Sequence, residues 1–240
     1  MKTLKKALSC LCLVLVSGEA LAQEKPEKQE KPETKETLEQ LVDRVQAFYE
    51  KIQDFSASFE QRYNHKLIDM TQVSSGRVIF RKPARMRWDY EKPTKRSFLI
   101  TENQVLALDI AALTLTKAAI ETDKLSVALT FLWGRGNLRE EFNIAYAECK
   151  GCKEIRLELV PKKEESRFQK LFLDINPRTS QVMQSIVVDP DGSENRIRFS
   201  NWKENQDLKP EAFRLSVPDG TQFLDMTKVP EAAKATEARP

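Results

Sequence analysis

Short segments in which apolar and polar residues alternate recur through most of this 240-residue chain. In residues 85–90, for example, Met86, Trp88 and Tyr90 alternate with charged residues. A period of two places successive side chains on opposite faces of a β-strand. Turn residues separate the segments, as in Asp-Pro-Asp-Gly at 189–192. Many short strands joined by turns predict an antiparallel barrel or sandwich.

The predicted strands form two series. They are residues 55–61, 73–81, 85–90, 97–101, 105–110 and 113–117, followed by 141–147, 154–160, 168–175, 181–188 and 196–202. Two further segments, 213–217 and 221–224, are expected to close the sheet. Residues 64–69 have the composition of a polar loop.

Two helices are predicted. The first covers 38–52, where apolar residues recur at helical spacing after a potential cap at Thr37. Its single apolar stripe has to pack against something, most simply a sheet. The second covers 123–133 and is apolar nearly all round, so it must be enclosed. Because it lies between the two strand series, it is either an ordinary packed helix or a lid over the sheet.

The N-terminus has the pattern of a secretory signal peptide. Lysines precede an apolar run, and Ala-Leu-Ala at 20–22 is typical of a cleavage site. No lipobox precedes a cysteine, so we expect the exported chain to be free of a lipid anchor. Residues 23–35 and 229–240 are polar and charged and are expected to be disordered, which leaves one domain at 36–228.

The charge balance and the motifs exclude several classes of function. Cleavage after residue 22 leaves 36 basic against 35 acidic residues, so no nucleic-acid footprint is expected. His65 is the only histidine, and no nucleophile elbow, phosphate loop or metal-ligand spacing occurs. We therefore expect no enzyme activity, cofactor or metal. Cys149 and Cys152 form either a small disulfide or a free pair at a hairpin tip.

Several blocks in order resemble the LolA family of periplasmic lipoprotein carriers. They are the Phe-Ser-Ala-Ser-Phe-Glu-Gln run at 55–61, the basic-Pro to aromatic block at 81–93, the Leu-rich segment ending in Gly-Arg-Gly at 134–136, the strand at 157–162, and 213–220. The resemblance implies a mainly β fold with α: an unclosed antiparallel β-barrel covered by helices, enclosing a hydrophobic cavity.

The resemblance also implies a site and partners. Arg81 or Lys82 would latch the lid closed. The partners would be acylated lipoproteins, an inner-membrane ABC transporter that releases them and an outer-membrane receptor, with the carrier a periplasmic monomer. A carrier of another lipid, or a module that senses lipoproteins, are the alternatives. The acyl-chain cavity would be lined by Tyr49, Phe59, Phe80, Met86, Trp88, Tyr90, Leu99, Leu129, Phe131, Leu132 and Trp133.

Overall fold

The computed structural model describes residues 36–119, 136–163 and 168–228. The predicted signal peptide, the tether at 23–35, the second helix at 123–133 and the tail at 229–240 lie outside these residues. Within them, no helix has both the length and the apolar character needed to cross a membrane.

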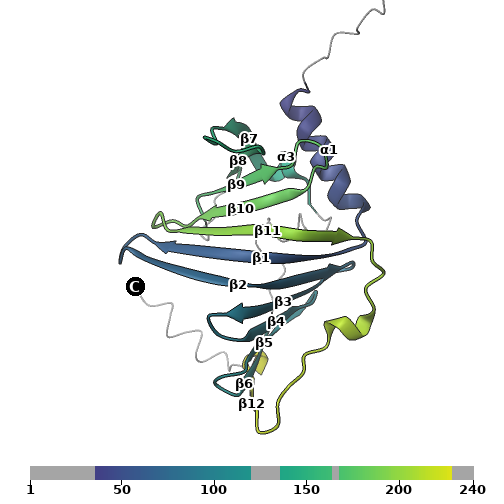
Figure 1. Ribbon diagram of the computed structural model, residues 1–240, viewed down its shortest axis with the longest axis vertical. Coiled ribbons are helices and arrows are strands. Elements are labelled where there is room, and N and C mark those ends of the chain that lie inside the picture. Colours follow the sequence, from purple (N-terminus) through teal and green to yellow (C-terminus); the bar gives the residue numbers. More distant parts are fainter. Residues whose placement is uncertain (1–35, 120–135, 164–167, 229–240) are drawn as a thin grey trace, which may run out of the picture. The chain divides into compact units, whose positions relative to one another are not determined.

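One curved sheet of 12 strands contains every strand described (Figure 1), and the prediction of a mainly β, unclosed fold is confirmed. Its order is β12-β6-β5-β4-β3-β2-β1-β11-β10-β9-β8-β7, so β12 and β7 are the two edges. The strands are β1 (Asp54–His65), β2 (Met70–Arg81), β3 (Arg85–Lys92), β4 (Arg96–Ile100), β5 (Gln104–Asp109), β6 (Thr114–Ala119), β7 (Phe142–Ala147), β8 (Ile155–Pro161), β9 (Lys170–Ile175), β10 (Val182–Val188), β11 (Glu194–Glu204) and β12 (Gln222–Asp225).

The pairing register assigns each side chain to one of two faces, because residues directly opposite in antiparallel strands point the same way. Phe80 lies opposite Phe55 on β1 and Met86 on β3. We call the face that carries these residues the inner face. Phe59 lies opposite Phe199, so the same face continues across β11 into the second strand series.

Helix α1 (Leu38–Lys51) covers part of the inner face. It begins with the predicted cap: the Thr37 hydroxyl accepts from the Gln40 N–H at 3.3 Å, and the Gln40 side chain accepts from the Thr37 N–H at 2.9 Å. This capping box satisfies two N–H groups at the helix start. The buried stripe of α1, which is Leu41, Val42, Val45 and Tyr49, joins one hydrophobic core with β1, β2 and β8–β11.

The chain after β11 differs from the prediction. Residues 213–217 do not form a strand; a short 3₁₀ helix, η2 (Pro210–Phe213), precedes an extended stretch. β12 then pairs with β6 in parallel, whereas the prediction was wholly antiparallel. The Arg87 guanidinium donates to the Ala212 and Arg214 carbonyl oxygens at 3.0 and 2.6 Å, which ties this connection to the sheet.

Two smaller helices complete the described chain. They are α3 (Leu138–Glu141), which precedes β7, and η3 (Met226–Lys228), which follows β12.

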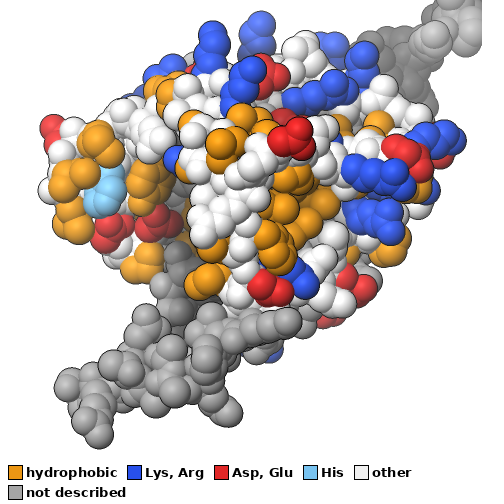
Figure 2. Space-filling view, turned by 90° about the horizontal axis from the view of Figure 1, so that it is seen from below, with side chains coloured by type: hydrophobic (Ala, Val, Ile, Leu, Met, Phe, Trp, Pro, Cys, Tyr) orange, Lys and Arg blue, Asp and Glu red, His pale blue; other side chains and the backbone are white. Residues whose placement is uncertain are grey.

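The β1–β2 hairpin is longer than predicted. β1 continues to His65 and β2 starts at Met70, so residues 64–69 are not simply a polar loop. Leu67 and Ile68 in the turn are 74% and 61% exposed. In Figure 2 the single histidine is flanked by hydrophobic side chains at one end of the molecule. The hairpin therefore ends in an exposed apolar tip.

Gly76 allows β3 to approach β2 closely, which gives a stability prediction. A Cβ built at Gly76 overlaps the backbone oxygen of Asp89 and lies 3.0 Å from the Tyr90 Cα. Since backbone atoms cannot move aside easily, we expect Gly76→Ala to lower the free energy of unfolding by about 1–3 kcal/mol. Urea denaturation measures this, with Ser75→Ala on the same strand as the control. Equal stability of the two variants would contradict the close approach.

Candidate functional site

Most of the predicted cavity residues that the structure describes lie on the inner face of β1–β3. The Phe59 ring packs edge-on against Trp88 and Tyr90, with ring centroids 4.9 Å apart in both pairs. Phe80 and Met86 lie opposite each other and are fully buried. The alternation in the sequence therefore brings these five side chains together on one apolar surface.

The inner face has two unequal parts. In β8–β10, inner-face residues such as Leu157 and Leu171 are fully buried within the core to which α1 contributes. In β3 and β4, Trp88, Tyr90 and Ile100 pack against the same core but are only half-buried. Figure 2 shows hydrophobic side chains gathered at the surface, with Lys and Arg to one side. The β3–β5 part thus offers apolar area that a ligand could cover.

Leu99 corrects the predicted cavity. It lies opposite Arg87 on β3 and Leu106 on β5, whereas Met86 lies opposite Ile100. Leu99 therefore points to the outer face, and its assignment to the cavity is wrong. The strand itself was predicted correctly, but the face depends on the register between β3 and β4.

Tyr49 lies in packed core. Its side chain is 1% exposed, and its hydroxyl oxygen accepts from the Val182 N–H at 3.1 Å. The Tyr49 and Trp202 rings meet edge to face at 6.5 Å. Burial raises the pKa of Tyr49, so the hydroxyl stays neutral. Tyr49 therefore joins α1 to β10 and β11.

Lys82 caps the C-terminal end of α1. Its Nζ donates to the Tyr49 and Glu50 carbonyl oxygens at 3.0 and 2.6 Å. Carbonyl groups in the last turn of a helix lack partners within the helix, and a cation there also stabilises the helix dipole. Partial burial lowers the pKa of Lys82, and the Glu50 carboxylate opposes this effect. Lys82 thus fixes α1 to the start of the β2–β3 turn.

The structure separates the two residues of the predicted latch. Arg81 lies opposite Asp54 on the outer face, whereas Lys82 reaches α1. The proposed contact between a latch and a lid stays a prediction, because the lid residues lie outside the described part of the chain. These are Leu129, Phe131, Leu132 and Trp133.

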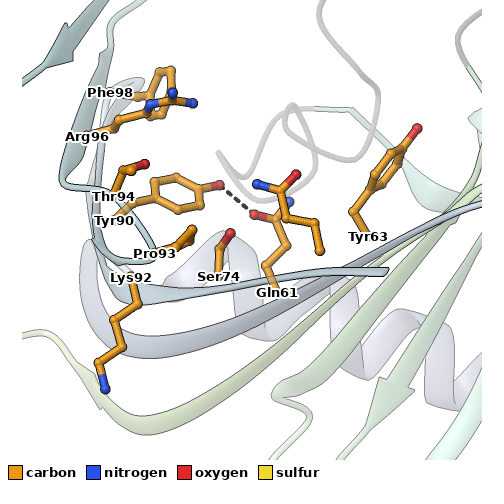
Figure 3. A pocket seen from close by; sticks show the side chains of 10 residues that line it. Gln61, Tyr63, Ser74, Tyr90, Lys92, Pro93, Thr94, Arg96 and Phe98 are labelled. Carbon is orange, nitrogen blue, oxygen red and sulfur yellow. Dashed lines mark hydrogen bonds between the residues drawn. The ribbon is translucent and has the colours of Figure 1, made fainter. Parts of the chain in front are cut away.

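Toward the hairpin tip, the inner face becomes polar and hollow (Figure 3). A cavity of about 240 Å³ lies here. The Tyr90 hydroxyl donates to Gln61 Oε1 at 2.9 Å, and Gln61 Nε2 donates to Asn195 Oδ1 at 2.9 Å. Burial raises the pKa of Tyr90, which keeps this donor protonated. The cavity is lined by Gln61, Tyr63, Gln72, Ser74, Tyr90, Lys92, Pro93, Thr94, Arg96 and Phe98.

Cys149 and Cys152 are joined as a disulfide in the connection between β7 and β8, with their Cα atoms 5.5 Å apart. The Asp174 carboxylate lies within 4.8 Å of the two sulfurs. It is bound by the Arg156 guanidinium at 2.7 and 2.9 Å and by the Gln184 amide at 2.9 Å. Oxidised sulfurs beside a carboxylate that is already paired do not make a metal site.

Several inner-face residues were not predicted as part of the site. Trp202 stacks on Phe55 with ring centroids 4.2 Å apart, and Phe199 packs near Trp88 at 6.3 Å. Both belong to β11, whose pairing with β1 spans most of the chain. The polar end of the inner face could have been predicted from the sequence, because Gln61 continues the alternation of Phe55 and Phe59.

These features define a class of protein: a half-barrel with an apolar inner face, helix α1 packed on part of it, and a polar hollow at one end. Residues 50–216 match the family described as outer membrane lipoprotein carrier protein LolA. The chain belongs to the LolA family.

Named relatives agree with this membership, and a solved structure shares the fold. An outer-membrane lipoprotein carrier protein of Nitrosomonas europaea is 24% identical over 183 residues, covering 76% of this chain and 88% of the relative. One from Methylococcus capsulatus is 26% identical over 184 residues, covering 76% and 86%. An uncharacterized conserved protein from Thermus thermophilus shares the fold, with a TM-score of 0.50 at 13% identity over 78% of this chain and 98% of that one.

The Lys82 cap generates a mutational prediction. Lys82→Leu leaves two helix carbonyls without their cation, so we expect the free energy of unfolding to fall by about 1 kcal/mol. Arg81→Leu is the matched control, since the neighbouring side chain points to the other face. Urea denaturation of both variants measures the difference. If Arg81→Leu destabilises as much as Lys82→Leu, the cap does not anchor α1.

Proposed function

We propose that this protein is a periplasmic carrier that binds the acyl chains of lipoproteins and moves them between membranes. Membership of the LolA family and the names of the relatives support lipoprotein binding. The observation that carries the proposal is the half-buried apolar surface around Trp88 and Ile100 on the inner face. An acyl chain can lie on that surface beside the core that α1 completes.

The energetics require such a surface. Burial of each CH₂ is worth about 0.8 kcal/mol, so exposing a chain of about sixteen carbons to water costs roughly 12 kcal/mol. A carrier recovers most of this cost by covering the chain. It must also release the chain, so the apolar area offered should be limited. Among the described residues, the β3–β5 part of the inner face leaves apolar side chains half-buried, and an apolar area of this limited extent meets both needs.

The direction of transport needs partners. We propose that an ATP-driven inner-membrane transporter loads the carrier and that an outer-membrane receptor with a more apolar site unloads it. The signal-peptide pattern at residues 1–22 supports export to the periplasm. Binding and release involve no covalent step, so the proposed function needs neither a catalytic residue nor a cofactor.

Release of lipoproteins from spheroplasts tests this function. The mature protein, starting at Gln23, is added outside the inner membrane of cells that contain the cognate transporter. We expect lipoproteins to appear in the supernatant in a complex with the added protein, as detected by co-purification. Absence of release, with the transporter present and active, would contradict the carrier function.

Two side chains on opposite faces give a binding prediction. We expect Trp88→Ala to weaken binding of an apolar fluorescent dye by about tenfold or more, because a large aromatic side chain contributes roughly 1.5–3 kcal/mol of burial. Leu99→Ala removes an apolar side chain from the outer face and should leave affinity unchanged. Fluorescence titration measures both variants. Equal affinity for both would show that the dye does not bind the inner face.

A further inference from the structure

The inner face changes chemistry along the strands. On β1 it runs from Phe55 and Phe59 to Gln61 and Tyr63, with the polar residues nearer the hairpin tip. β2 shows the same change from apolar to polar at the paired positions. Phe80 and Val78 lie opposite apolar residues of β1, and Ser74 and Gln72 lie opposite Gln61 and Tyr63. One continuous surface therefore has an apolar half and a polar half.

The polar half is a hollow with fixed walls. Tyr90 and Asn195 hold Gln61 from two sides by hydrogen bonds of 2.9 Å. The Tyr63 hydroxyl donates to Asp189 Oδ2 at 3.1 Å. These bonds span β1, β3 and β11 and the turn after β10, so the walls are set before any ligand arrives. At about 240 Å³ the hollow is slightly below the 300–1,000 Å³ typical of sites for drug-sized ligands, which suits a small head group.

The hollow retains unused hydrogen-bonding groups. Ser74 is 7% exposed, and its hydroxyl points between Tyr90 and Gln61 (Figure 3). No hydrogen bond links the side chains of Ser74, Gln72 or Thr94 to one another or to other parts of residues 36–119, 136–163 and 168–228. Hydroxyl and amide groups both donate and accept, so these three side chains can bind esters, hydroxyls or amides.

The charged residues around the hollow do not favour an anion. The Lys92 side chain runs away from Tyr90 and Gln61 (Figure 3). The Arg96 guanidinium is already paired with a carboxylate, because its Nε donates to Asp109 Oδ2 at 2.8 Å. The groups that face the hollow from β1, β2 and β3 are therefore neutral, and they match a neutral ligand.

We propose that this hollow binds the uncharged polar part of the acylated ligand, namely the ester and amide groups that join acyl chains to a lipoprotein's N-terminal cysteine. This assignment rests on the proposed carrier function. The acyl chains then lie toward Phe59 and Trp88, and the head lies between Gln61 and Ser74. The ligand is held in one orientation because each half of the inner face matches one half of the ligand.

Three probes separate head recognition from chain burial. They are a synthetic N-palmitoyl-S-(dipalmitoylglyceryl)cysteine peptide, 1-monopalmitoylglycerol, and the head-free dye N-phenyl-1-naphthylamine. The double variant Gln72→Leu/Ser74→Val removes two polar groups from the hollow. Ser75→Val, on the adjacent residue of β2 that faces the other way, is the control. Affinities are measured by titration, with dye displacement for the two lipids.

We expect the double variant to bind the lipopeptide at least about fivefold more weakly, since each neutral hydrogen bond contributes modestly. Dye affinity should stay within twofold, which also shows that the variant is folded. A parallel loss for monopalmitoylglycerol would assign the hollow to the glyceryl ester, and a loss for the lipopeptide alone would assign it to the amide. Unchanged lipopeptide affinity, or an equal loss for the dye, would overturn the assignment. If the native protein binds none of the three probes, the carrier function itself fails.

Discussion

The packing of α1 against the inner face determines which part of the sheet is left available for a ligand. An open sheet exposes one apolar face unless something covers it, and α1, with a single apolar stripe, covers only part of this 12-stranded sheet. The stripe contacts the β10 and β11 side through Tyr49. The β3–β5 side therefore keeps apolar residues that are only half-buried. Among the residues that the structure describes, the candidate binding surface is therefore the part of the inner face that α1 does not reach.

The C-terminal end of α1 is also held by a cation. Lys82 follows the end of β2, yet its ammonium group holds the last carbonyls of α1. The sequence offered Arg81 and Lys82 as alternative latches for the predicted lid. It could not predict which groups bind Lys82, because a lysine ammonium group can donate to any carbonyl oxygen nearby. The contact exists because the fold places the end of α1 beside the β2–β3 turn.

Features set by local sequence could be predicted, and features set by contacts between distant segments could not. Alternation identified nearly every strand, and the cap at Thr37 identified the start of α1, since both signals are local. The face predicted for Leu99 was wrong, because the face depends on the pairing of β3 with β4. The parallel pairing of β12 with β6 could not be predicted either, because the connection from β11 follows a path set by contacts such as those of Arg87. Local patterns specify elements, and non-local contacts specify faces and edges.

Gly76 lies where the inner face changes from apolar to polar. It sits opposite Phe59 on β1 and Tyr90 on β3, at a shift in the register of β2 and β3. Without a side chain on Gly76, the β3 backbone approaches closely, and the rings of Phe59 and Tyr90 meet across the gap. Tyr90 therefore presents its ring to the apolar half and its hydroxyl to Gln61 in the polar half. An amphipathic side chain at the boundary makes the change of chemistry abrupt, and an abrupt boundary orients an amphipathic ligand.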